Sequence, residues 1–215
     1  MKKMPFAVLA ILVTALAIGM AAPVASAQTD SIQQVDVFST NYFSNNTTPG
    51  APPATLRFTE QESQAVAGAN PAIDYTEECA MIYVYAADQQ LAECCGCPVS
   101  KNGLVSENVQ KDLLGNTLTR VVPNEGVIQI VSGRYLDLGS IGVCDPTKFI
   151  PAPEINSWLT HIQNKVGTGF PITETHGDEE FLSDDEFVTL EADCAFAMRL
   201  GSGFGICHCN TEAVK

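Results

Sequence analysis

Short stretches in which apolar residues alternate with polar ones, or run unbroken for a few positions, recur along the chain. They lie at 33–38, 56–59, 79–85, 91–95, 117–122, 126–131 and 135–138. Gly, Pro, Asn and Asp separate them, and this spacing predicts an antiparallel, sandwich-like core of short strands. The stretch 79–85 is nearly apolar on both faces, which predicts a central strand buried on both sides.

The hydrophobic period changes toward the C-terminus, where we expect two helices. Residues 154–165 carry an apolar stripe at helical spacing, formed by Ile155, Trp158, Leu159 and Ile162. The second helix begins after Ser183, which stands three residues before Glu186 as in a capping box, and ends near Gly201. The predicted fold class is therefore α+β, mainly β, with a sandwich-like core and two C-terminal helices.

The N-terminal residues form the pattern of a secretory signal peptide. Lys2 and Lys3 precede an uncharged apolar run at 6–22, Pro23 interrupts it, and Ala-Ser-Ala follows at 25–27. The alternative is an uncleaved membrane anchor, because about 17 apolar residues reach the lower limit for a membrane span. The small residues at 25–27 favour cleavage after position 27, and no later stretch is long and apolar enough to span a membrane.

Cleavage leaves residues 28–215, a length suited to one domain. We divide it into a polar N-terminal part (28–76), a cysteine-rich strand core (77–150) and a helical C-terminal part (151–215). The whole chain has a net charge of −14, and without residues 1–27 it keeps nine basic and 25 acidic residues, a charge of about −16. Such a charge repels nucleic acid and anionic membranes. We expect an extracellular or envelope partner of unknown identity, and a secreted, periplasmic or cell-envelope location.

The cysteine count is even, which indicates disulfides in an exported chain. The eight cysteines are Cys79, Cys94, Cys95, Cys97, Cys144, Cys194, Cys207 and Cys209. A hairpin turn at 86–89 places Cys79 opposite either Cys95 or Cys97, which lie on one face of their strand while Cys94 faces away. The other preferred pair is Cys194 with Cys207, because the chain can fold back after the second helix. Adjacent Cys94 and Cys95 are expected to have different partners.

Three motifs resemble those of a set of secreted, cysteine-rich bacterial proteins that has no assigned activity. They are ECCGCPV at 93–99, NGL at 102–104 and GSGFGIC at 201–207. A cysteine-rich hairpin and a Gly-Ser-Gly-x-Gly-x-Cys tail recur in that set in the same order, and the resemblance covers about 79–209. It implies export and a single domain, and it transfers no catalytic residue.

Two metal sites are alternatives to a purely structural or binding role, and only the zinc site competes with the disulfides. Zinc could bind the Cys94, Cys95, Cys97 cluster together with Cys207, His208 and Cys209, although neither spacing is that of a common zinc knuckle. Calcium could bind the stretch 174–193, which holds nine acidic residues but lacks the spacing of a helix–loop–helix calcium loop.

A hydrolase is the other alternative, with His161 or His176 beside acidic residues. No G-x-S-x-G motif is present, and Ser202 follows a helix and not a strand, so it is not a nucleophile elbow. We predict no catalytic residue, no resident metal and no cofactor. The expectation is an exported, acidic, disulfide-rich structural or binding protein.

Overall fold

The computed structural model describes residues 37–60, 77–100, 102–135, 144–153 and 155–209. The expected signal peptide at 1–27, most of the expected strand at 33–38 and residues 136–138 of another lie outside the described residues. The described elements are β1 (Phe38–Phe43), β2 (Thr55–Glu60), β3 (Glu77–Ala86), β4 (Leu91–Ser100), β5 (Leu104–Asn108), β6 (Gly126–Tyr135), β7 (Phe149–Pro151), β8 (Ile155–Ile162), β9 (Ile172–His176), β10 (Asp178–Glu180) and α1 (Asp184–Arg199).

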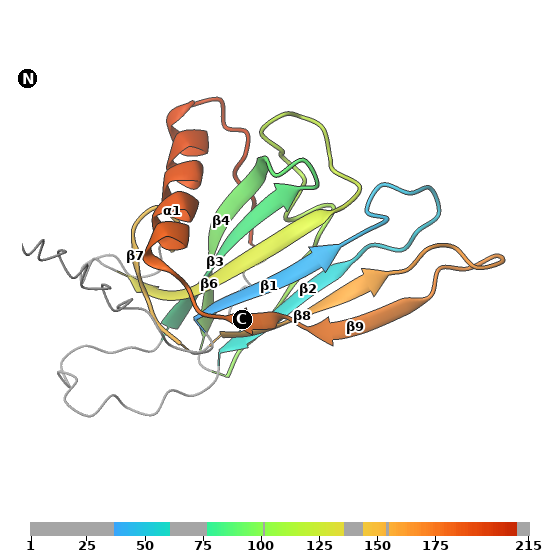
Figure 1. Ribbon diagram of the computed structural model, residues 1–215, viewed down its shortest axis with the longest axis horizontal. Coiled ribbons are helices and arrows are strands. Elements are labelled where there is room, and N and C mark those ends of the chain that lie inside the picture. The colour runs from blue at the N-terminus through green and yellow to red at the C-terminus, as the bar shows by residue number, and fades with distance from the viewer. Residues whose placement is uncertain (1–36, 61–76, 101, 136–143, 154, 210–215) are drawn as a thin grey trace, which may run out of the picture.

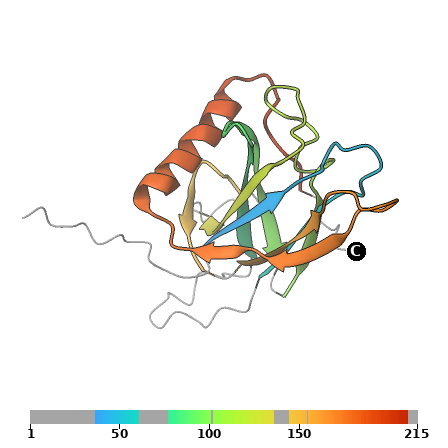
Figure 2. The ribbon, with the colours of Figure 1, turned by 45° about the vertical axis from the view of Figure 1, so that its right-hand side comes forward.

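The strands form two antiparallel sheets, so the mainly β prediction is confirmed. Sheet A has the order β10-β1-β6-β3-β4, with β7 paired to β6, and sheet B has the order β5-β2-β8-β9. Helix α1 lies beside sheet A in Figure 1, and the view in Figure 2 also places it at one side of the sheets. The chain thus forms two sheets and one described helix.

Two apolar clusters hold these layers together. The inner cluster lies between the sheets and includes Phe58 from β2, Ile82 from β3 and Leu159 from β8. The outer cluster lies between sheet A and α1 and includes Met81 and Leu190. Strand β3 contributes to both clusters, and its residues 79–84 are fully buried. The predicted central strand is therefore confirmed.

The predicted helix at 154–165 is wrong, because residues 155–162 form β8. Strand β8 pairs with β2 on one side and β9 on the other. Ile155 and Leu159 face the inner cluster in a strand as they would in a helix, since positions four apart share a face in both structures. The part 151–215, expected to be helical, therefore contains β8, β9 and β10 as well as α1.

The second predicted helix is confirmed as α1. The Ser183 side chain accepts a hydrogen bond from the Glu186 backbone N–H at 3.1 Å, and Leu190, Cys194 and Ala197 are buried. Gly201 follows with φ of 61°, the left-handed conformation that ends many helices.

The predicted strand at 117–122 is also wrong, because these residues form turns and irregular backbone. Arg120 has φ of 62°, which a continuous strand does not permit. Only Leu118 bonds to β4, through its N–H to the Ala92 carbonyl at 2.8 Å. In the polar part 28–76, β1 belongs to sheet A and β2 to sheet B.

Candidate functional site

All eight cysteines form disulfides, as the even count predicts. The pairs are Cys79–Cys144, Cys94–Cys194, Cys95–Cys207 and Cys97–Cys209. Only Cys95, Cys97 and Cys209 bring three metal-binding side-chain atoms within 4.8 Å of one another in the described part of the chain. Their sulfurs belong to two disulfides, so this state offers zinc no thiolate.

The predicted bond from Cys79 to Cys95 or Cys97 is wrong because of a β-bulge. Tyr85 faces Leu91 across the hairpin, whereas Val84 faces Glu93, so β4 carries one extra residue. Cys79 then lies opposite Pro98 and belongs to the outer cluster, while Cys95 and Cys97 point into the inner one. A shift of one residue exchanges the two faces of a strand, and Cys79 therefore bonds Cys144 on the outer side.

The predicted Cys194–Cys207 bond is wrong as well. Cys194 lies on the buried face of α1 and bonds Cys94, which points outward from sheet A. Cys207 lies on the inner side and bonds Cys95. Adjacent cysteines in a strand point to opposite faces, so the prediction that they have different partners is confirmed.

The C-terminal tail lies along the free edge of β4. The Cys94 N–H donates to the Gly205 carbonyl at 2.9 Å, and the Cys207 N–H donates to the Cys94 carbonyl at 3.1 Å. Cys94 and Ile206 form a parallel bridge. Two of the three resemblance motifs, ECCGCPV and GSGFGIC, therefore lie side by side, and a disulfide joins Cys95 of the first to Cys207 of the second.

Gly96 separates the cysteines of the ECCGC motif for a steric reason. A Cβ atom at this position would lie 2.3 Å from the Cys144 carbonyl oxygen and 2.6 Å from the Cys144 Cβ. The segment that carries Cys144 thus packs directly on the backbone of Gly96, beside Cys79. Only glycine permits such a close contact. The three cysteines of the motif, each in a disulfide, therefore surround a residue that has no side chain.

Glu93 is a buried carboxyl group at the start of the same motif. Its side chain is fully buried, and one oxygen accepts a hydrogen bond from the Asn116 backbone N–H at 2.6 Å, whereas the other has no hydrogen-bond partner. Burial raises the pKa of Glu93 to about 7, although the hydrogen bond from Asn116 acts in the opposite direction. The Asn116 side chain also donates to the carbonyls of Gly203 and Ile206, so Glu93 supports the junction between β4 and the tail.

Within the described ranges, neither histidine of the hydrolase hypothesis contacts both a nucleophile and an acid. His161 is buried, its Nε2 contacts the Thr175 hydroxyl, and its ring lies 4.2 Å from that of Tyr42. No carboxylate in the described part of the chain is hydrogen-bonded to this ring. Burial lowers the pKa of His161, and the Tyr42 backbone opposes this effect.

His176 and His208 lie elsewhere. His176 Nε2 lies 3.3 Å from the Asn156 side-chain oxygen and 3.5 Å from a Glu179 carboxylate oxygen, and its ring packs edge-on against Trp158. No hydroxyl group is hydrogen-bonded to His176 in the described residues. His208 is exposed, and its backbone N–H bonds the Asp112 carbonyl. With the partners that the structure describes, the three rings therefore form no catalytic triad of the kind known in hydrolases.

The acidic stretch 174–193 is spread over β9, β10 and α1. Glu174 pairs with Arg57 on β2, and Asp184, Asp185 and Glu186 occupy the first turn of α1. Negative charge stabilises a helix N-terminus, which accounts for three of the acids without a cation. Within the described ranges, no three acids of this stretch place oxygens within 4.8 Å of one another.

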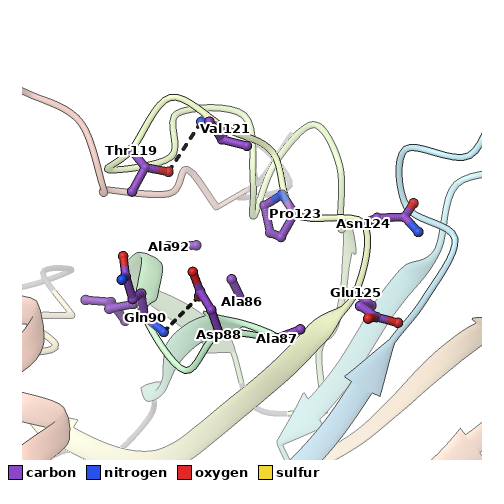
Figure 3. A pocket seen from close by; sticks show the side chains of 11 residues that line it. Ala86, Ala87, Asp88, Gln90, Ala92, Thr119, Val121, Pro123, Asn124 and Glu125 are labelled. Atoms are coloured by element: carbon purple, nitrogen blue, oxygen red, sulfur yellow. Dashed lines mark hydrogen bonds between the residues drawn. The ribbon is translucent and has the colours of Figure 1, made fainter.

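A cleft of about 520 Å³ lies between two segments that sequence reasoning did not connect. We call it the turn–loop cleft, because the β3–β4 turn forms one wall and the loop 119–125 forms the other (Figure 3). Its apolar lining consists of Ala86, Ala87, Leu91, Ala92, Val121 and Pro123. Its polar lining consists of Asp88, Gln90, Thr119, Asn124 and Glu125.

Hydrogen bonds brace both walls, within the turn on one side and from residues outside the cleft on the other. In the turn, the Ala86 N–H bonds the Gln90 carbonyl, and Gln89 has φ of 67°. In the loop, the Asn124 side-chain oxygen accepts hydrogen bonds from Thr47 and Thr48, and the Asn46 side chain donates to the Pro123 carbonyl. A wall fixed in this way loses little conformational freedom when a ligand binds.

Comparisons with protein-family models, with curated proteins and with solved structures find no match. The likeness to secreted bacterial proteins therefore rests on the cysteine motifs alone and stays a prediction. No helix among the described residues has the length and apolar character to cross a membrane.

Proposed function

We propose that this protein is an exported, non-catalytic binding domain that holds a small ligand in the turn–loop cleft. The cleft is the observation that carries the proposal. Its volume of about 520 Å³ falls within the range of small-molecule sites, roughly 300–1,000 Å³, and its mixture of apolar surface and a few polar groups is typical of them.

Three further features support this function over the alternatives. Among the described residues, the histidines lack the partners that a hydrolase needs, and the cysteines are oxidised, which removes the ligands of a zinc module. The four disulfides and the apolar N-terminal run support export. Disulfides also hold β4, the strand that starts at the floor of the cleft, against α1 and the tail.

Binding in the cleft can be tested by two-dimensional NMR of the disulfide-intact protein with a panel of small fragments of different charge. We expect hits whose chemical-shift changes concentrate at 86–92 and 119–125. Replacement Ala87→Trp fills the cleft from its exposed turn and should abolish these changes. Replacement Ala192→Trp is the matched control, because Ala192 is an exposed alanine on α1, outside the cleft lining.

Two results would contradict the proposal. One is binding that persists unchanged in Ala87→Trp, which would place the ligand elsewhere. The other is turnover of an ester, amide or glycoside substrate that is lost on replacement of His161 or His176, which would favour the hydrolase alternative.

A further inference from the structure

We infer that the turn–loop cleft selects small organic cations, namely an ammonium or guanidinium group attached to an apolar body. This inference rests on the proposed binding function and adds the chemical class of the ligand. It depends on the position of the charged groups around the cleft, which can be followed in Figure 3.

Each wall of the cleft carries one carboxylate. Asp88 lies in the β3–β4 turn, and Glu125 lies at the end of the facing loop. One Asp88 oxygen accepts the Gln90 backbone N–H at 3.2 Å, which fixes the side chain and leaves its second oxygen for a ligand. Both residues are exposed at the rim, so a cation there can reach a carboxylate without the cost of burying it.

No basic side chain is among the described residues that line the cleft. The nearest one in sequence, Arg120, is held away from it. Its guanidinium carbon lies 4.3 Å from the centre of the Phe204 ring, on the C-terminal tail, which is a cation–π contact. The backbone of Arg120 supports this orientation, because its φ of 62° reverses the chain between Thr119 and Val121. The charge of the cleft is therefore negative and uncompensated by its own lining.

The apolar part of the lining defines the rest of the ligand. Leu91 and Ala92 are buried at the floor, and Val121 and Pro123 lie in the loop wall. An alkyl or aryl group can pack on these residues while its ammonium group remains at the rim. The net charge of −14 attracts cations to the whole molecule and repels carboxylate or phosphate ligands.

The test compares three probes of one shape and different charge: phenethylamine, phenethyl alcohol and 3-phenylpropionate. Binding to the disulfide-intact protein is measured by chemical-shift titration at about 20 mM and about 300 mM salt, on either side of the range in which surface charges become screened. We expect the amine to bind more tightly than the alcohol by about fivefold or more at low salt, with a smaller ratio at high salt. The carboxylate should bind most weakly.

The variant Asp88→Asn with Glu125→Gln removes both rim charges and keeps the side-chain shapes. Exposed ion pairs are worth little individually, so we expect each replacement to weaken amine binding by about two- to fivefold and to leave alcohol binding unchanged. The control is Asp178→Asn with Glu180→Gln on β10. It changes the net charge equally, but β10 lies at the opposite edge of sheet A from β4.

The outcomes separate the ligand class from the binding function. Alcohol or carboxylate binding that equals amine binding, and is lost in Ala87→Trp, would overturn the cation preference while the binding function stands. Equal weakening by the rim variant and the β10 control would also overturn it, since only the overall charge would then matter. Absence of any shift at 86–92 and 119–125, with the three probes and the wider fragment panel, would overturn both.

Discussion

Replacement of Glu93 with Gln should change the dependence of stability on pH. The carboxyl group is buried between β4, Asn116 and the tail, and its pKa in the folded state is about 7, against 4.5 as its ordinary value. The folded protein therefore binds a proton more tightly than the unfolded chain does. The stability that this proton contributes is complete below pH 4.5 and is lost as the pH rises to 7 and above.

The size of the effect follows from the two pKa values. Each tenfold change in proton affinity corresponds to about 1.4 kcal/mol, so the ionisation of Glu93 lowers the free energy of unfolding by about 3 kcal/mol between pH 4.5 and pH 8. Gln cannot ionise and keeps an oxygen that accepts the Asn116 N–H. The variant should therefore lack this decrease and become more stable than the natural protein above pH 7.

Urea unfolding at a series of pH values, with disulfides intact, measures this difference as a shift of the midpoint. Glu180→Gln serves as the control, because Glu180 is an exposed glutamate on β10 and should leave the pH dependence unchanged. An identical pH dependence in Glu93→Gln and the natural protein would refute the assignment of the raised pKa to Glu93.

Three further changes test the supports of the fold. The double replacement Cys94→Ala with Cys194→Ala should lower the free energy of unfolding by about 3 kcal/mol. The reason is that, with Cys95–Cys207 intact, the lost bond closes a loop of about 15 residues. A loss under about 1 kcal/mol in chemical denaturation contradicts this account. Ser183→Ala should cost about 1 kcal/mol through loss of the α1 cap, measured against Ser106→Ala on the exposed face of β5. Gly96→Ala should leave Cys79 and Cys144 as free thiols, detected by mass after alkylation without reduction. The control Gly169→Ala, where a Cβ has open space, should remain fully oxidised.

The strands that could be predicted from the sequence are those in which the apolar residues of the pattern are also the ones buried in the sheet. Strands β6, β3 and β4 are neighbours in sheet A, and their largely apolar runs match their burial. The C-terminal helix was also predictable, since Ser183, Glu186 and Gly201 mark its ends through local contacts. Strand β8 was not predictable, because the spacing of Ile155 and Leu159 fits a helix as well as a strand. These residues form a strand because they pair with β2 and β9, which lie far away in sequence or follow later in the chain.

The cysteine pairs and the cleft depend on features that local patterns do not contain. The disulfides depend on one bulge near Val84, which changes the face that Cys79 presents. The cleft exists because residues 86–92 and 119–125 lie close together. It was not predicted, because residues 117–122 were expected to form a strand and not a loop. The predicted strand is interrupted at Arg120, which has a positive φ. Arginine is not a residue type that indicates a positive φ, so the sequence does not reveal the interruption.

The disulfides between β4 and the C-terminal segments also limit the order in which the native disulfides can form. A chain is synthesised from its N-terminus, so Cys79, Cys94, Cys95 and Cys97 appear long before Cys194, Cys207 and Cys209. Of the native bonds, Cys79–Cys144 can form first, because it closes over 65 residues, whereas the three thiols of β4 need partners 100 or 112 residues away in sequence. Oxidation in order of appearance would join neighbours within the ECCGC motif and give the wrong bonds. The native pairs therefore form either by thiol–disulfide exchange that corrects the early bonds, or by oxidation after the tail has been synthesised.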